Sequence, residues 1–401
     1  MKTYVLALVV LLCASACVAA PAPGTPAPST AVGPSGTSAS TVAATNTPTA
    51  SAPPVAYRVM SSVPGRATVS PDGRWIASLT RQAGGSIFET IQLFTIDGTP
   101  TREITDAGVF WGWLPDSSGL FIAPMIPQKA PPLAIVDLDG RVISTELQLS
   151  HQTLSRDGML IVAEHQEGCC MSIVQREIRV ARRDGTGVRT LALSQIPVEP
   201  QTVALLGIDN SERAVYRDGT KIMRVPLSGG ATTTLATSSE YARVIAGNTS
   251  PDGAAMVSRG YEPARWFVIA NDRVTAWDDS LGSLVEDGNP GLTKTGPAAF
   301  WIGPHTLLAR DLVGAISLVD ALTNARTSQA GRLLNSDVVL AHQRGTLLVV
   351  RGGVVVLIDL GTGGVRETGL DLRPNSGGTH AFALPSGGFL LSSSMATYRI
   401  D

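Results

Sequence analysis

Residues 67–105 read ATVSPDGRWIASLTRQAGGSIFETIQLFTIDGTPTREIT, and this stretch decides the fold class. Short β-rich runs alternate with turns, and two of the turns carry Asp-Gly, at residues 72–73 and 97–98. Glycine takes positive φ without strain and aspartate bonds its own backbone, so both residues favour tight turns between antiparallel strands. The stretch therefore predicts four short strands. Because one such sheet cannot bury both of its faces alone, copies of it should stack.

The first turn returns along the chain in weaker forms. It precedes short apolar runs at residues 70–73, 115–119, 155–158, 209–211, 250–253, 303–304, 343–345 and 385–388. A second series of turns alternates with the first, at residues 97–98, 139–140, 184–185, 229–230, 271–272, 323–324 and 361–363. Shared among eight units, residues 57–401 give about 43 residues per unit, near the length of a four-stranded propeller blade.

These repeats predict an all-β chain folded as an eight-bladed β-propeller of four-stranded blades, with seven blades as the alternative count. The eighth unit is one strand short, because only residues 396–400 follow its second strand. We expect residues 57–63 to supply the missing outer strand. The two ends of the domain then share one blade, which closes the ring and removes its open edges.

Two segments carry a resemblance to a known family. The sequences SPDGRWIAS (70–78) and SPDGAAMVS (250–258) resemble the Pro-Asp repeats of TolB-like β-propellers, relatives of the WD-repeat propellers. The resemblance covers almost all of residues 57–401 and implies a propeller fold. Such blades also occur in gating domains of peptidases and in pectate-type lyases, so the resemblance does not name an activity.

The N-terminal 20 residues predict an export signal, with Lys2 at the start, an apolar core at residues 4–12 and small residues before Cys17. This resembles a bacterial lipoprotein signal, which implies cleavage before Cys17 and lipid attachment there. An ordinary signal removed near residue 20 is the alternative. Residues 21–55 are nearly all Pro, Ala, Ser, Thr and Gly, so we expect a disordered tether ahead of a propeller at residues 56–401.

Composition excludes some functions. The formal net charge is −2 and no basic stripe is present, so we expect no nucleic-acid binding. Beyond the signal the only cysteines are Cys169 and Cys170, which cannot form a disulfide framework. In an exported protein these adjacent thiols are predicted either to oxidise, as a vicinal disulfide or with another chain, or to remain two small buried residues.

The sequence predicts no catalytic residue, metal or cofactor. No Gly-x-Ser-x-Gly nucleophile elbow is present in the sequence. His151, His342 and His380 lie in or near the inner strands of three different units, where side chains distant in sequence could converge in the central channel. Isolated histidines near strand ends more often make structural hydrogen bonds, and no HxH or HExxH spacing accompanies these three.

We therefore expect a monomeric, non-catalytic binding or scaffold module, exported to the outer face of the bacterial cytoplasmic membrane or the cell envelope. Its partners would be the membrane, through a lipid anchor, and a protein or glycan bound at the rim or channel. The alternative is a lyase or hydrolase with a metal or histidine site in the channel. Residues 278–297, the longest irregular connection, are predicted to be exposed and to form part of the contact surface.

Overall fold

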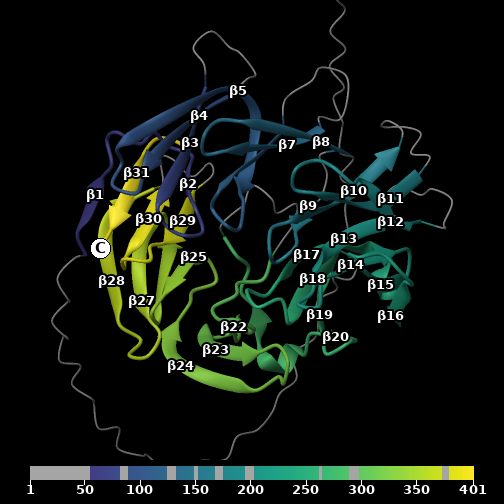
Figure 1. Ribbon diagram of the computed structural model, residues 1–401. Coiled ribbons are helices and arrows are strands. Elements are labelled where there is room, and N and C mark those ends of the chain that lie inside the picture. Colours follow the sequence, from purple (N-terminus) through teal and green to yellow (C-terminus); the bar gives the residue numbers. More distant parts are fainter. Residues whose placement is uncertain are drawn as a thin grey trace, which may run out of the picture. The chain divides into compact units, whose positions relative to one another are not determined.

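The computed structural model describes residues 55–81, 89–123, 132–148, 152–167, 175–194, 203–261, 264–288, 298–372 and 379–401. Its strands form eight four-stranded antiparallel blades arranged as a β-propeller, as predicted (Figure 1). Two short 3-10 helices, η1 (Ser239–Arg243) and η2 (Asp279–Leu281), precede blades 5 and 6. Within the described residues, no helix is long and apolar enough to cross a membrane.

The first four blades follow one another along the chain, each running from its inner to its outer strand. Blades 1 and 2 consist of β2 (Ala67–Val69), β3 (Trp75–Arg81), β4 (Glu89–Thr95), β5 (Pro100–Trp113), β6 (Gly119–Ala123), β7 (Pro132–Asp137) and β8 (Val142–Gln148). Blades 3 and 4 consist of β9 (Gln152–Leu154), β10 (Leu160–Glu167), β11 (Gln175–Arg182), β12 (Arg189–Leu193), β13 (Val203–Ile208), β14 (Arg213–Asp218), β15 (Lys221–Pro226) and β16 (Thr233–Thr237).

The other four blades complete the ring. Blades 5 and 6 consist of β17 (Val244–Thr249), β18 (Ala255–Tyr261), β19 (Ala264–Ala270), β20 (Arg273–Ala276), β21 (Ser283–Leu284), β22 (Thr306–Arg310), β23 (Ala315–Asp320) and β24 (Arg326–Arg332). Blades 7 and 8 consist of β25 (Val338–Gln343), β26 (Thr346–Arg351), β27 (Val354–Asp359), β28 (Val365–Asp371), β29 (His380–Ala383), β30 (Phe389–Ser392), β31 (Thr397–Ile400) and β1 (Tyr57–Val59).

Blade 8 confirms the predicted closure of the ring. Its outer strand is β1, which pairs with β31 so that Tyr57 lies opposite Ile400 and Val59 opposite Tyr398. Blades 1 and 2 differ from the rest, because the 14-residue strand β5 pairs with β4 through its first part and with β6 through its last. One strand therefore serves two blades, and the two form a continuous seven-stranded sheet.

The Ser-x-Asp-Gly turn is the same hydrogen-bonded unit in three blades. In blade 1 the Ser70 hydroxyl donates to Asp72 Oδ1 at 2.6 Å and accepts from the Trp75 backbone N–H at 3.0 Å. Gly73 follows at φ +69°. The matching residues of blades 3 and 5 make the same bonds, at 2.6 and 2.8 Å in blade 3 and at 2.7 and 3.0 Å in blade 5. A local hydrogen-bond pattern thus explains why the motif recurs.

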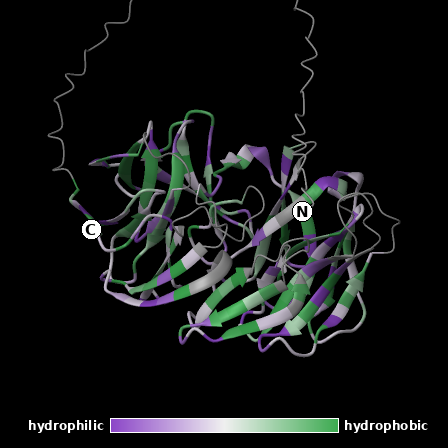
Figure 2. Cartoon of the chain, turned by 90° about the horizontal axis from the view of Figure 1, so that it is seen from above, coloured by the Kyte–Doolittle hydropathy of each residue, from purple (hydrophilic) through white to green (hydrophobic). Residues whose placement is uncertain are grey.

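Apolar side chains of neighbouring blades pack against each other around the ring. One cluster joins Val162 and Ile178 of blade 3 to Leu205 and Tyr216 of blade 4. Figure 2 shows the most hydrophobic residues concentrated along the strands. Because strands in a blade are antiparallel, the turns between first and second and between third and fourth strands share one side, here called the Asp-Gly face. The remaining connections lie on the opposite face.

The prediction that residues 278–297 are exposed holds for residues 278–280 and is wrong for residues 282, 284 and 285. Residues 283–284 form β21, and Leu284 and Val285 are buried. Glu286 bridges to Ala299 and Asp287 to Val339, so this segment joins the inner part of blade 6 and touches blade 7. Two apolar residues between a serine and a glutamate were too short a run to recognise as a strand. Residues 289–297 lie outside the described part of the chain.

Candidate functional site

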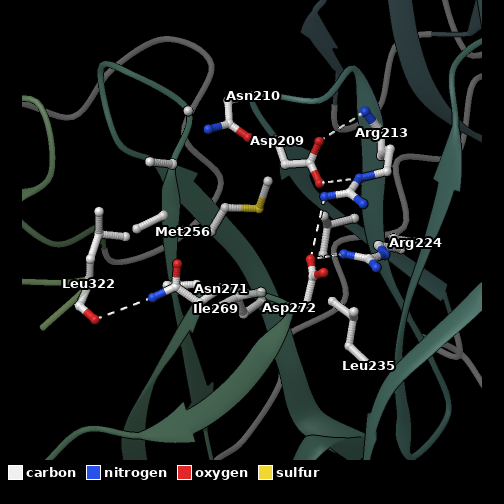
Figure 3. A pocket seen from close by; sticks show the side chains of 15 residues that line it. Asp209, Asn210, Arg213, Arg224, Leu235, Met256, Ile269, Asn271, Asp272 and Leu322 are labelled. Carbon is white, nitrogen blue, oxygen red and sulfur yellow. Dashed lines mark hydrogen bonds and ion pairs between the residues drawn. The ribbon is translucent and has the colours of Figure 1, made fainter.

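A pocket of about 250 Å³ lies on the Asp-Gly face between blades 4 and 5 (Figure 3). Four turns of three blades surround it. These are the turns at residues 209–212 and 250–255, which join first to second strands, and the turns at 270–273 and 320–325, which join third to fourth strands. The site is therefore built where three repeat units meet, from turns of both repeated series.

The floor of the pocket is apolar. Met256 and Val215 are almost completely buried, Ile269 is also buried, and Leu235 and Leu322 are partly exposed along the walls. These side chains come from strands of blades 4 and 5 and from the β23–β24 turn of blade 6. Because the free energy falls when apolar surface is removed from water, this floor favours a ligand that has an aliphatic part.

Two arginines and two aspartates form the charged side of the pocket. Arg213 Nε donates to Asp209 Oδ2 at 2.7 Å, and its Nη2 reaches Asp272 Oδ1 at 3.4 Å. Arg224 also donates to Asp272 Oδ1. Figure 3 shows both guanidinium groups approaching Asp272 from the blade 4 side. The hydrogen bond from Arg224, reinforced by both positive charges, lowers the pKa of Asp272, so this carboxylate is ionised at neutral pH.

Asp272 occupies the tip of the β19–β20 hairpin. Asn271 and Asp272 have φ of +50° and +61°, the positive values that a two-residue type I′ turn requires. The turn carries the carboxylate across the interface from blade 5 to the arginines of blade 4, yet the Asp272 side chain remains 60% exposed. Among the described residues, the exposed carboxylate of Asp272 is therefore the only partner of the Arg224 guanidinium.

His305 joins two walls of the pocket at its blade 6 side. Its Nδ1 lies 2.9 Å from Asp252 Oδ2 in the β17–β18 turn, and its Nε2 lies 3.1 Å from Asp320 Oδ2 at the end of β23. The turn after Asp320 carries Leu322, whose backbone N–H donates to Asp320 Oδ1 at 2.9 Å. The imidazole thus connects the turn that carries the Leu322 wall to the turn of the neighbouring blade.

The two carboxylates favour the protonated form of His305. The hydrogen bond to Asp252 raises the pKa of His305, the negative charges of Asp320 and Asp252 act in the same direction, and burial opposes them. Burial would raise the pKa of Asp252, but the hydrogen bonds from Ser250 and His305 outweigh it and lower that pKa. The carboxylates contact opposite nitrogens of the ring, so they do not converge on one point. Within the described ranges, no three His, Cys, Asp or Glu side chains are arranged to hold a metal ion.

The structure does not bring His342 and His380 together. His342 lies near the end of the inner strand β25, where its Nε2 accepts from the Gly345 backbone N–H at 3.1 Å, and His380 begins the inner strand β29. Inner strands run in the same direction, so the two side chains lie toward opposite faces of the ring. Burial lowers the pKa of both imidazoles. His151, Cys17, Cys169 and Cys170 lie outside the described residues.

Sequence reasoning missed the residues that form the pocket. The Asn271-Asp272 turn belongs to the second repeated series, so its position was predictable, but its charge partners were not. Arg213 and Arg224 follow strand patterns that look like any exposed strand position. The one available signal was Asp272 itself, which stands where the matching turns at 97–98, 139–140 and 184–185 have glycine.

Comparisons with known proteins support the fold and leave the activity open. The sequence matches no protein-family model and no curated protein. The computationally designed protein Ika8 is 12% identical, with a TM-score of 0.53, over 84% of this chain and 96% of its own. The dihydro-haem d1 dehydrogenase NirN, solved with DHE, is 17% identical, with a TM-score of 0.50, over 82% of this chain and 70% of its own. AztD from Citrobacter koseri is 12% identical, with a TM-score of 0.47, over 77% and 87%.

Proposed function

We propose that this chain is a non-catalytic, exported binding module related to TolB-like propellers, and that it captures a protein partner at the pocket between blades 4 and 5. One observation carries the proposal. Arg224 lies beside an unfilled apolar floor, and among the described residues its only partner is the exposed carboxylate of Asp272. A cation next to apolar surface is suited to a ligand that combines a carboxylate with an aliphatic group.

The size of the pocket favours a protein over a glycan. Its volume of about 250 Å³ is below the range of roughly 300–1,000 Å³ that suits drug-sized ligands, so it fits one side chain or one chain end. A C-terminal aliphatic residue presents both features at once, because its α-carboxylate and its side chain leave the same Cα atom. A neutral oligosaccharide has no carboxylate, and an acidic one has no aliphatic group of this size beside its carboxylate.

Asp272 competes with such a ligand for the arginine. The guanidinium of Arg224 offers a planar fork that fits a carboxylate in two parallel hydrogen bonds. A bound carboxylate would replace Asp272 there, while Arg213 remains held by Asp209. Removing the charge of Asp272 should therefore strengthen ligand binding, whereas removing the charge of Arg224 should weaken it.

Capture from the cell envelope tests the proposal. Tagged full-length protein would be cross-linked and isolated, and its partners identified by mass spectrometry, for wild type, Arg224→Gln, Asp272→Asn and Arg183→Gln. Arg183 is the matched control, because it forms the same kind of ion pair with Asp116 between blades 2 and 3 and does not line the pocket. We expect Arg224→Gln to lose a partner that Arg183→Gln and Asp272→Asn retain.

A small probe gives a second, direct measurement. Isovalerate combines a carboxylate with a branched aliphatic tail, and its binding should raise the melting temperature of Asp272→Asn more than that of wild type. Arg224→Gln should show no such rise. Equal partner capture by all four proteins, with no isovalerate effect in any of them, would show that the pocket does not bind the partner. Metal-dependent turnover abolished by changing His151, His342 and His380 together would overturn the non-catalytic assignment.

The proposal includes a lipid anchor at Cys17, with the chain at the outer face of the cytoplasmic membrane or in the cell envelope. The small residues before Cys17 and the Pro- and Ala-rich segment after it support this placement. Cys17→Ser should release the protein from the membrane fraction of lysed cells. A wild-type protein that is already soluble, or a mature chain that begins after Cys17, would contradict the anchor.

A further inference from the structure

The hairpin turn between β22 and β23 of blade 6 presents aliphatic side chains to solvent, on the face opposite the pocket. In the sequence Asp311-Leu312-Val313-Gly314, Leu312 is 96% and Val313 73% exposed. Leu334, on the neighbouring β24–β25 connection, is 51% exposed. Turn tips usually carry Gly, Asn, Asp or Ser, so a Leu-Val tip is not explained by turn formation. We call Leu312, Val313 and Leu334, together with Arg310 and Arg332, the tip patch.

The turn is held firmly by its backbone. The carboxylate of Asp311 accepts from the N–H groups of Val313 at 3.0 Å and Ala315 at 2.8 Å. Gly314, at φ +85°, accepts from the Leu333 N–H at 2.9 Å, and a Cβ on it would lie 2.1 Å from the Leu333 carbonyl oxygen. The aliphatic tip is therefore a fixed projection next to Leu334. Glycine is required at position 314, because any side chain there would collide with the backbone of Leu333.

The charge around the tip is positive. Among the residues that the structure describes, Arg310 donates only to the backbone carbonyls of Leu334 at 2.5 Å and Asn335 at 3.5 Å, and Arg332 is exposed at the end of β24. Asp311 is engaged by its own turn, and the Asp337 side chain is buried against Arg351 at 2.7 Å. Within the described part of the chain, neither Arg310 nor Arg332 has a carboxylate partner, so two cations flank the exposed aliphatic residues.

From this arrangement we propose that the tip patch docks on a membrane surface that contains anionic lipids. Leu312 and Val313 enter the outer part of the acyl region, and the guanidinium groups of Arg310 and Arg332 meet lipid phosphates beside them. The charge complementarity selects anionic headgroups. The shape selects a bilayer over a protein surface, because a projecting tip finds room in a fluid layer without needing a matching pocket.

Hydrogen exchange of the full-length chain, carrying Cys17→Ser, would test this docking. Exchange would be measured alone, with phosphatidylcholine vesicles, and with vesicles that also contain phosphatidylglycerol. The readout is local, so binding of the N-terminal apolar segment does not mimic it. We expect the backbone amides of residues 311–315 to be protected by the anionic vesicles only, while those of residues 155–160 on the Asp-Gly face exchange unchanged.

Variants separate the contribution of the aliphatic side chains from that of the arginine charges. Leu312→Ser with Val313→Ser should abolish the local protection, because the lost aliphatic surface weakens docking by about tenfold or more. Arg310→Gln and Arg332→Gln should each weaken it by about fivefold and reduce its dependence on anionic lipid. Met159→Ser, an exposed apolar residue on the other face, is the control and should change nothing.

Several results would overturn the docking. These are unprotected amides at residues 311–315 with anionic vesicles, protection that survives in the Leu312→Ser, Val313→Ser variant, and protection by an isolated acidic protein but not by lipid. Because Leu312 is almost fully exposed, the single variant Leu312→Ser should fold normally. It therefore keeps the test valid if the double variant does not fold.

Discussion

The interface between blades 8 and 1, here the closing interface, and the interface between blades 4 and 5, here the pocket interface, differ in how they are packed. At the closing interface Ala67 N–H donates to Ser392 Oγ at 2.6 Å, and Thr397 Oγ1 donates to the Pro64 carbonyl at 2.8 Å. A Cβ on Gly73 would lie 2.3 Å from the ring of Pro385. The pocket interface instead holds partly exposed ion pairs around a cavity.

The two interfaces also differ in how their blades are assembled from the chain. Blades 4 and 5 are joined by continuous chain through η1, so their turns can leave a cavity without separating the blades. Blade 8 receives β1 from the other end of the domain, and only non-covalent contacts hold it there. Residues 60–66 connect β1 directly to blade 1, so the tight packing at the closing interface supports a blade whose outer strand is joined to β31 by hydrogen bonds and packing alone.

The largest expected effect comes from removing the closing strand. Deleting residues 21–63 should lower the free energy of unfolding by about 5 kcal/mol or more, because it removes β1 and the buried Met60 and Val63 and exposes the edge of β31. Deleting only residues 21–54 is the control and should leave the melting temperature nearly unchanged. Equal melting of the two truncations would show that closure does not depend on this strand.

Substituting glycine in two equivalent turns separates backbone strain from packing. Gly73→Ala and Gly158→Ala place alanine at φ +69° and +70°, where each should lose about 1–2 kcal/mol to left-handed strain. Gly73→Ala also forces its Cβ against Pro385, whereas nothing lies within 4 Å of a Cβ on Gly158. We expect an additional loss of about 1–3 kcal/mol at Gly73, measured by chemical denaturation. Equal losses of stability in the two variants would mean that Pro385 moves aside for the added methyl group at little cost.

Removing one polar contact from each interface should change stability less than the glycine substitutions do. Thr397→Val removes a donor from the fully buried Thr397 and should cost about 1–3 kcal/mol, because the Pro64 carbonyl loses that hydrogen bond. Arg224→Gln should cost less than about 1 kcal/mol, because its partner Asp272 is mostly exposed. Denaturation midpoints of both variants give the comparison. A larger loss for Arg224→Gln would show that the pocket ion pairs stabilise the fold.

The smallest effect concerns pH at the pocket interface. The folded pKa of His305 is raised above the ordinary value of 6.5, so its ion pairs contribute fully below pH 6.5 and are lost as the pH rises through the raised pKa. His305→Gln should therefore reduce stability by less than about 1 kcal/mol near pH 6 and have a smaller effect near pH 9. Melting curves at both pH values, with His342→Gln for comparison, measure this. A His305→Gln effect that grows with pH would contradict the assignment.

The architecture was predictable because its signals are local. A serine, an aspartate and a glycine within four residues form their own turn, so each copy marks a blade wherever it occurs. Counting the copies predicted eight blades and the need for a closing strand. Blade 6 was harder to place, since its first strand has two residues and its turn at residues 303–304 lacks the motif.

The features that suggest function depend on tertiary structure. Arg224 meets Asp272 across 48 residues, and His305 meets Asp252 across 53, each pair joining neighbouring blades. Alternation within a strand indicates which face is buried, but it carries no information about which turn of the next blade approaches a given side chain. The sequence by itself determined the repeat, the closure and the turns. Only the packing of one blade on the next decided where charges meet, where a cavity remains and which aliphatic residues stay in water.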